Sequence, residues 1–184
     1  MKRLFDIFFV TFVLLLTWPI LIVCAIAVRV DSPGSIFYRQ QRVGYEGKIF
    51  DIYKFRSMVR NADQIGSYQT MQGDSRITSI GALLRRTSLD ELPQLLNVLK
   101  GDMSLVGPRP DVPAQRELYS DGEWARRVSV RPGITGLAQA TLRSAATKEQ
   151  RRSLDLEYVD KASLLLDLKI LLLTMRQIFS KGGV

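Results

Sequence analysis

TSLDELPQLLNVLKGDMSLVGPRP, residues 87–110, is the stretch that decides how the chain folds. Pro93 has no N–H and fits only in the first turn of a helix, and Gly101 is a typical residue just past a helix end. We therefore predict a short helix that begins near Asp90. Leucines recur in it at spacings of three and four, which predicts an apolar stripe against the core. The stripe comprises Leu92, Leu95, Leu96 and Leu99, and the opposite side carries Gln94, Asn97 and Lys100.

Two adjacent acids, Asp90 and Glu91, lie at the start of this helix. Capping explains them without any function, because Asp is a preferred N-cap, Ser88 and Glu91 have capping-box spacing, and the helix dipole stabilises acids in a first turn. The catalytic alternative makes one carboxylate a nucleophile or base and both carboxylates ligands of a divalent cation. The pair alone favours capping, so other parts of the chain have to decide.

The composition narrows the possible chemistry. The 184 residues suffice for one domain with a substantial core. They contain no histidine, which excludes a Ser-His-Asp triad or a His-ligated zinc site, and the single cysteine, Cys24, cannot form an intrachain disulfide. The net charge of +8 favours anionic partners, namely nucleic acid, a membrane surface or a phosphorylated substrate.

Residues 7–28 form an uncharged, strongly apolar stretch. As a helix it would be about 33 Å long, enough to cross the hydrocarbon core of a membrane. Pro19 interrupts it, Thr17 offers a hydroxyl beside the interruption, and basic residues flank both ends, so positive charge does not select one end for translocation. A kinked transmembrane helix and a helix that breaks at Pro19 and returns to the same face both fit. The flanking cations are Lys2, Arg3 and Arg29.

Patterns elsewhere predict the remaining elements. We expect a β-hairpin with arms at residues 36–39 and 49–59 around a turn at 44–47. The second arm carries Lys54 and Arg56 on one face. The other expected elements are a polar loop at 61–79, a helical turn at 80–86, a loop at 101–113, a helix at 117–130 with exposed Arg126 and Arg127, a turn at 131–136, and helices at 148–161 and 163–179. The last helix is too short and too charged to span a membrane, so it is expected to lie buried or at the membrane interface.

Basic side chains from separate segments are expected to converge on the acid pair. They are Lys54, Arg85, Arg86, Arg109 and Arg143. Such a cluster suits a bound polyphosphate, and no P-loop or dinucleotide-binding glycine motif offers another phosphate site. The structural alternative is a simple ion pair between Arg85 or Arg109 and Asp90. Either way, nearby cations are expected to lower the pKa of Asp90 and keep it ionised.

Several short motifs follow one another along the chain: KRxFD at 2–6, KFR at 54–56, DELPQ at 90–94, NVLKGDMS at 97–104, VGPRP at 106–110 and RPGITG at 131–136. Together they resemble the bacterial sugar transferases, the monotopic phosphoglycosyl transferases that start polysaccharide and glycoprotein glycan assembly. The resemblance runs from Lys2 to about Leu172 and covers the catalytic domain alone.

The resemblance implies a ping-pong reaction. An aspartate of the family attacks the sugar-bearing phosphate of a UDP-sugar, expels UMP and holds a phosphosugar, which polyprenyl (undecaprenyl) phosphate then accepts. By position Asp90 is that nucleophile, Glu91 lies beside it, and both acids would hold Mg²⁺. The basic positions near the family's phosphate site are matched by Lys54, Arg85, Arg109 and Arg143.

The family's broken N-terminal helix is re-entrant, so the resemblance favours that topology, with its hinge at Thr17 and Pro19. It implies an α+β protein, mostly helical with a small β-hairpin. Residues 1–30 would form the re-entrant membrane helix, and residues 31–184 a catalytic domain with interfacial amphipathic helices. The expected location is the cytoplasmic face of the bacterial inner membrane. Expected partners are the UDP-sugar, polyprenyl phosphate, membrane lipid and a second copy or downstream glycosyltransferases, but not nucleic acid.

Two departures from the family pattern leave details open. Trp18, rather than a serine, precedes Pro19, which leaves the hydrogen bonds of the hinge open. Leu137 replaces a commoner tryptophan, and Thr141-Leu142 replaces a familiar Asn-Gly. This leaves open which sugar the protein transfers. Two other classes remain as rivals: a membrane-anchored basic module that binds nucleic acid or anionic lipid without catalysis, and a structural membrane subunit in which Asp90 is only a cap.

Overall fold

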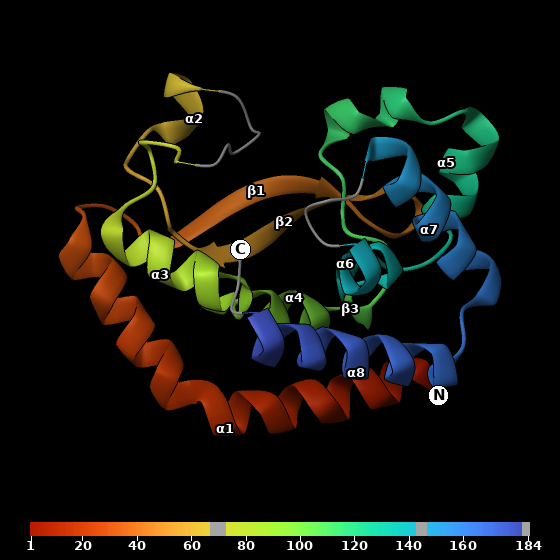
Figure 1. The fold of residues 1–184 in the computed structure, drawn as a ribbon, viewed down its shortest axis with the longest axis horizontal. Coiled ribbons are helices and arrows are strands. Elements are labelled where there is room, and N and C mark those ends of the chain that lie inside the picture. The colour runs from red at the N-terminus through yellow and green to blue at the C-terminus, as the bar shows by residue number, and fades with distance from the viewer. Residues whose placement is uncertain (67–72, 143–146, 182–184) are drawn as a thin grey trace.

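The computed structural model describes residues 1–66, 73–142 and 147–181 (Figure 1), without the side chains of residue 63 and residues 178–181. The chain is mostly helical, as the sequence predicts. Its α-helices are α1 (Lys2–Asp31), α2 (Ala62–Ile65), α3 (Ser79–Thr87), α4 (Gln94–Lys100), α5 (Asp121–Arg127), α6 (Leu137–Leu142), α7 (Lys148–Lys161) and α8 (Leu164–Lys181). The strands are β1 (Phe37–Val43), β2 (Ile49–Phe55), β3 (Ser104–Val106) and β4 (Gly133–Thr135), and the 3₁₀ turns are η1 (Tyr45–Gly47), η2 (Leu89–Glu91) and η3 (Pro113–Leu118).

Helix α1 is continuous but bent. Its interior contains Pro19, which cannot donate to the carbonyl four residues earlier, that of Leu15. Figure 1 shows the helix changing direction near its middle. The Thr17 hydroxyl donates to the Val13 carbonyl at 2.8 Å, so it does not replace the bond lost at Leu15. The helix therefore bends where the sequence predicted a break, and the re-entrant topology stays a prediction.

The first turns of α1 are fixed to the body of the protein by polar contacts. Asp6, which is 2% exposed, accepts hydrogen bonds from the Ser104 hydroxyl at 2.8 Å and from the backbone N–H of Leu105 at 3.2 Å. Arg3 donates to the Val98 carbonyl at 2.6 Å. A buried carboxylate is costly unless it is hydrogen-bonded, so these contacts fix where α1 meets β3.

The last turn of α1 is fixed to the same body. Arg56, which follows β2, donates to the Ser32 carbonyl at 2.5 Å and to the Val28 carbonyl at 3.3 Å. Asp31 accepts a hydrogen bond from the backbone N–H of Ile80 at 3.3 Å. Arg56 therefore satisfies carbonyls at a helix end, which is a structural role.

Strands β1 and β2 form the predicted antiparallel hairpin. Tyr38 pairs with Lys54, and Arg42 pairs with Phe50. Directly opposed residues share one face of a sheet, and faces alternate along each strand. Arg42 and Lys54 therefore lie on the same face as Ile52, which is buried.

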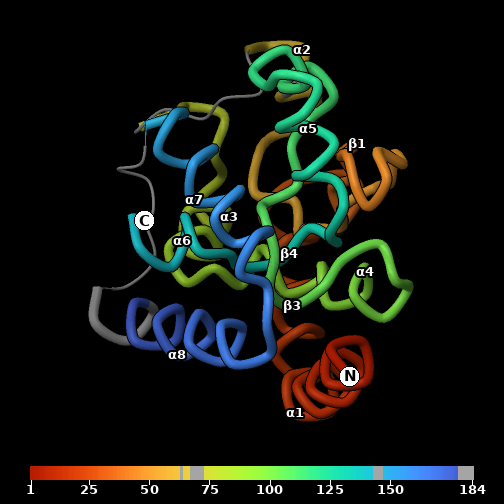
Figure 2. The backbone as a smooth tube through the Cα atoms, turned by 90° about the vertical axis from the view of Figure 1, so that its right-hand side faces the viewer, coloured from red at the N-terminus to blue at the C-terminus, as the bar shows by residue number. Residues whose placement is uncertain are grey.

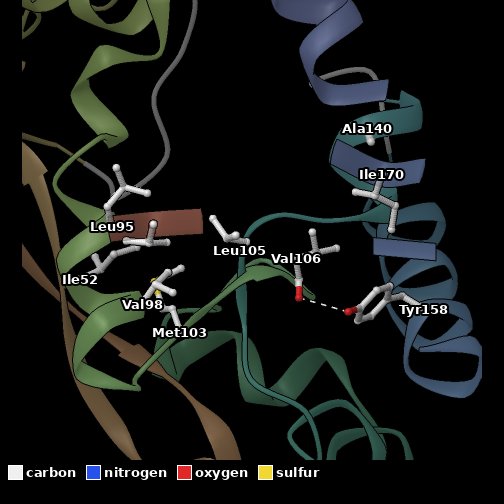
Figure 3. Packing of buried hydrophobic residues seen from close by; sticks show 10 residues of the cluster. Ile52, Leu95, Val98, Met103, Leu105, Val106, Ala140, Tyr158 and Ile170 are labelled. Atoms are coloured by element: carbon white, nitrogen blue, oxygen red, sulfur yellow. Dashed lines mark hydrogen bonds between the residues drawn. The ribbon is translucent and has the colours of Figure 1, made fainter. Parts of the chain in front are cut away.

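A small parallel sheet, β3 with β4, lies where the sequence predicted only a loop and a turn. Glycines permit its close backbone contacts: a Cβ on Gly107 would lie 2.3 Å from the Arg131 carbonyl oxygen. The main core packs around this sheet, and Figure 3 shows the Tyr158 hydroxyl donating to the Val106 carbonyl, at 3.1 Å. The core contains Val10, Ile52, Leu95, Val98, Met103, Leu105, Val106, Ala140, Tyr158 and Ile170.

The predicted apolar stripe of α4 is only half correct, because Leu95 lies in the core and Leu92 packs against it, but the other two leucines do not. Leu96 and Leu99 are exposed, whereas Gln94 and Asn97 are at most 1% exposed. Asn97 explains the rotation, because its amide joins α4 to the hairpin: the oxygen accepts from the Tyr53 N–H at 3.0 Å, and the nitrogen donates to the Asp51 carbonyl at 2.8 Å. Polar contacts therefore orient this helix more strongly than leucine spacing does.

The predicted helix over residues 117–130 is also divided. The 3₁₀ turn η3 precedes α5, and Arg127, expected to be exposed, is 4% exposed. It forms ion pairs with Asp111 at 3.1 Å and Asp155 at 3.0 Å. Arg126 is exposed as predicted and pairs with Asp160. Helix α7 has the predicted bounds, and α8 differs from its predicted bounds by one residue at the start and two at the end.

A broad apolar surface covers one side of the molecule. Figures 1 and 2 show α1 and α8 side by side along that side. Among the described helices, α1 alone is long and apolar enough to cross a membrane, by length and composition, and 11% of its most apolar window is buried. Exposed apolar patches of this extent mark contact with lipid or protein. The most exposed residues of this surface are Leu4, Phe8, Leu15, Leu16, Val23 and Val30 of α1 and Leu165 and Leu172 of α8.

Candidate active site

The acid pair lies in the 3₁₀ turn η2, between α3 and α4. Ser88 precedes it in the left-handed region, with φ of 59°. The Ser88 side chain makes no capping hydrogen bond to this turn, and Glu91 donates its backbone N–H to the Ser88 carbonyl at 3.2 Å. Helix α4 then begins at Gln94 after Pro93. The predicted capping box is therefore wrong, and capping does not account for the two acids.

Glu91 binds two cations from different parts of the chain. Its Oε1 accepts from Lys54 Nζ at 2.6 Å and from Arg109 Nη2 at 2.7 Å. Burial raises the pKa of Glu91, but the charges and hydrogen bonds of Arg109 and Lys54 outweigh this and hold it well below its usual range. Arg109 thus forms an ion pair as predicted, but its partner is Glu91 and not Asp90.

Asp90 is buried, at 7% exposed, and among the described residues none donates a hydrogen bond to its carboxylate. Burial raises its pKa to about 6, although Lys54, Arg85 and Arg109 each pull the pKa down. The expected lowering is therefore wrong, because desolvation outweighs the cations. Asp90 is still mostly ionised at pH 7, and a carboxylate poor in hydrogen bonds is a better nucleophile than one that donors surround.

The other predicted cations are placed differently. Arg85 donates to the Ser57 hydroxyl at 2.9 Å, and its charge acts on Asp90. Arg86 is exposed at the end of α3 and is not brought to the pair. Arg143 lies outside the described residues, so its predicted place in the site remains a prediction. The structure thus brings Lys54, Arg85 and Arg109 to the acid pair.

One basic residue of the site was not identified from the sequence. Arg42 of β1 is close enough to Arg109 and Glu91 to respond to their charges, and burial and Arg109 lower its pKa to about 10. The predicted hairpin arm ended at residue 39, so Arg42 lay outside it, and the observed register places Arg42 on the face that carries Lys54.

The acid pair fits Mg²⁺ as a ligand set. Mg²⁺ is usually held by one or two carboxylates together with substrate phosphates and water. The Asp90 carboxylate accepts no hydrogen bond from the described residues, and Glu91 uses Oε1 for both of its cations. No group of three or more His, Cys, Asp or Glu residues gathers in the part of the chain that the structure describes. A cation at this site would therefore depend on phosphate oxygens from a substrate.

In comparisons with known proteins, residues 1–181 match the family model described as bacterial sugar transferase. An uncharacterized sugar transferase, EpsL, from Bacillus subtilis (strain 168) is 45% identical over 184 residues, which cover 100% of this chain and 90% of that protein. A UDP-glucose:undecaprenyl-phosphate glucose-1-phosphate transferase from Caulobacter vibrioides is 43% identical over 95% of this chain and 68% of its own length. A UDP-N-acetylgalactosamine-undecaprenyl-phosphate N-acetylgalactosaminephosphotransferase from Aeromonas hydrophila is 39% identical over 99% of this chain and 44% of its own length.

Proposed function

The chain belongs to the bacterial sugar transferase family and is a phosphoglycosyl transferase, and we propose that it transfers a sugar 1-phosphate from a UDP-sugar to undecaprenyl phosphate, with release of UMP. Relatives named for this reaction support the donor class and the acceptor. The structural observation that carries the proposal is the buried Asp90 carboxylate, without a hydrogen-bond donor among the described residues, beside a glutamate that binds two cations.

Asp90 is the proposed nucleophile of a ping-pong reaction. One of its carboxylate oxygens forms a bond to the sugar-bearing phosphorus, and the bond from that phosphorus to the bridging oxygen breaks, so that UMP leaves with the electron pair. An oxygen of undecaprenyl phosphate then attacks the same phosphorus and restores the Asp90 carboxylate. The raised pKa supports this role, since a poorly solvated carboxylate gains most from forming a covalent bond.

Positive charge would hold the phosphates during both steps. Lys54 and Arg109 both bind Glu91, and the charge of Arg85 acts on Asp90, so three cations are available beside the acid pair to bind a diphosphate. Arg143 is proposed as a fourth. Mg²⁺, held by Asp90 and Glu91 together with phosphate oxygens, would offset the negative charge that gathers there.

A direct assay tests the reaction. Purified protein in detergent micelles, supplied with undecaprenyl phosphate and a panel of UDP-sugars, should release UMP with at least one of them. The panel also identifies the sugar, because the relatives are named for different sugars, glucose in one and N-acetylgalactosamine in another. Excess EDTA should stop the release and added Mg²⁺ should restore it. Absence of UMP with every donor would contradict the proposed reaction, and full activity in EDTA would remove Mg²⁺ from it.

We also propose that α1 is re-entrant, with the catalytic domain on the cytoplasmic face of the inner membrane. Lys2 and Asp6 bind residues of the catalytic domain at one end of α1, and Asp31 binds Ile80 of the same domain at the other end. A helix that crossed the bilayer would have to lose one set of contacts. When both ends of α1 lie on the same side of the membrane, the helix keeps all of these contacts, and its apolar surface can face lipid.

Cysteine labelling tests this topology. In a Cys24→Ala background, a cysteine replacing Lys2 and a cysteine replacing the exposed Lys148 of α7 are treated separately with a membrane-impermeant maleimide. Intact spheroplasts and inverted membrane vesicles present opposite faces to the reagent. We expect both positions to react in the same preparation, the inverted vesicles. Labelling of the two positions from opposite faces would identify α1 as an ordinary transmembrane helix.

A further inference from the structure

We propose that Arg42 and Arg127 are positioning residues for Arg109: they bind the backbone of its loop from two sides and so aim its guanidinium at Glu91 and a bound diphosphate. The inference rests on the proposed function only in that the anion is the diphosphate of the donor. Neither arginine contacts the acid pair through a hydrogen bond or ion pair among the described residues.

Each of the four carbonyls from Pro108 to Asp111, the loop that carries Arg109, has a hydrogen-bond donor. The Pro108 carbonyl accepts from the Gly133 N–H at 2.9 Å, and the Asp111 carbonyl accepts from the Val43 N–H at 2.9 Å. Between them, the Arg109 carbonyl accepts from Arg127 Nη2 at 2.6 Å, and the Pro110 carbonyl accepts from Arg42 Nη1 at 2.8 Å. These four donors come from β4, β1 and α5, all of which lie outside the loop.

The loop needs outside donors because of its sequence. Pro108 and Pro110 have no N–H, so the backbone on either side of Arg109 has few ways to form a turn bonded within itself. Prolines restrict its shape, but they do not fix where the loop lies relative to Glu91. The carbonyl contacts from Arg42 and Arg127 supply that position.

Arg127 is held rigidly for this task. It is 4% exposed, its charge is offset by Asp111 and Asp155, and the Tyr119 hydroxyl donates to Asp111 at 2.9 Å. A buried guanidinium is costly, and replacing such a group by apolar side chains is often neutral or favourable for stability. Its direct contact with the backbone of Arg109 gives it a role that stability alone does not explain.

Arg42 lies beside a like charge and forms no ion pair with any described acid. Its Nη2 donates to Gln40 Oε1 at 2.5 Å, its Nε is buried without a hydrogen-bond partner among the described residues, and the nearby Arg109 disfavours its charge. Asp111 and Glu91 favour the charge of Arg42, but burial and the repulsion from Arg109 outweigh them. Arg42 therefore keeps a buried charge beside Arg109, and its Nη1 donates to the next carbonyl of the loop.

A coupled binding experiment tests the inference. UDP is titrated calorimetrically into detergent-solubilised parent protein, Arg42→Gln, Arg127→Gln and Arg109→Ala, and into each loop variant combined with Arg109→Ala. We expect Arg42→Gln and Arg127→Gln each to weaken UDP binding about 10-fold in the parent background. Neither should weaken it further once Arg109 is alanine, because no guanidinium remains to be aimed. Arg126→Gln, on the same helix as Arg127 but paired on the surface with Asp160, should bind like the parent.

The outcomes are separable. Equal losses in both backgrounds would mean that Arg42 and Arg127 act independently of Arg109, and unchanged UDP binding in the single variants would mean that they do not act on the site; either result overturns the inference. If Arg127→Gln fails to fold, because Asp111 and Asp155 lose their cation, Arg42→Gln carries the test. Coupled UDP binding without UMP release from any UDP-sugar would uphold the positioning role and overturn the proposed reaction instead.

Discussion

Asp90→Asn is expected to abolish UMP release and to make the folded protein more stable. An amide cannot form the acyl phosphate, so no turnover should remain above background. The gain in stability follows from the pKa of about 6, against an ordinary 3.8: the folded state binds this proton more tightly than the unfolded chain. Ionisation of Asp90 therefore costs stability as the pH rises from 3.8 to about 6. At pH 7 the cost is about 3 kcal/mol, and a neutral amide avoids it.

Thermal unfolding and UMP release, measured on the same preparation at pH 7, check this prediction. Asp121→Asn is the control, because that carboxylate is 98% exposed on α5 and should affect neither quantity. Parent protein incubated with a UDP-sugar without acceptor should also carry one phosphosugar on the Asp90 peptide by mass spectrometry. Near-parental UMP release from Asp90→Asn would remove Asp90 from the mechanism, and a marked loss of stability would show that its charge supports the fold.

Glu91→Gln is expected to have the opposite effect on stability. Lys54 and Arg109 share Glu91 Oε1, so a neutral amide could still accept their hydrogen bonds but would leave two largely buried cations without a counter-charge. Breaking a buried pair in this way costs about 3–5 kcal/mol. Turnover should also fall roughly 100-fold, because the two cations that are proposed to hold the diphosphate lose the group that spaces them.

Glu46→Gln provides the matched control for this variant. Glu46 pairs with Lys48 at the tip of the hairpin, where both side chains are more than half exposed. Exposed pairs contribute about 0–1 kcal/mol, so its unfolding temperature and turnover should stay close to those of the parent. If the two glutamate variants unfold alike, Glu91 does not organise the site through its charge.

The elements predicted best from the sequence are those with local signals. The hairpin follows from β-forming residues around glycines, and α7 has a capping box of Thr147 and Gln150 at its start. The hairpin and α7 depend on residues close in sequence, so local patterns are enough to predict them. The motifs around Lys54, the acid pair and Arg109 made these residues candidates, but the contacts between them join segments 37 and 18 residues apart.

The features that the sequence did not predict depend on contacts between distant segments. The face of α4 is set by Asn97 reaching β2, and burial of Arg127 is set by Asp111 and Asp155, which no periodicity connects. The parallel pairing of β3 with β4 has too few residues to give a strand pattern. The pKa of Asp90 could not be predicted, because it depends on a competition between burial and charge that only three-dimensional packing decides.

The anchors of α1 bear on the order in which this protein assembles. Lys2 meets Asp167 and Asp6 meets Ser104, pairs that are 165 and 98 residues apart in the chain. A ribosome makes α1 before the elements that follow it, so the apolar helix is exposed long before either partner has been synthesised. At that stage the helix lacks both anchors, and its bend depends on Pro19, which lies within the helix itself. Asp167 completes the attachment of the first turn only after most of the chain has been made.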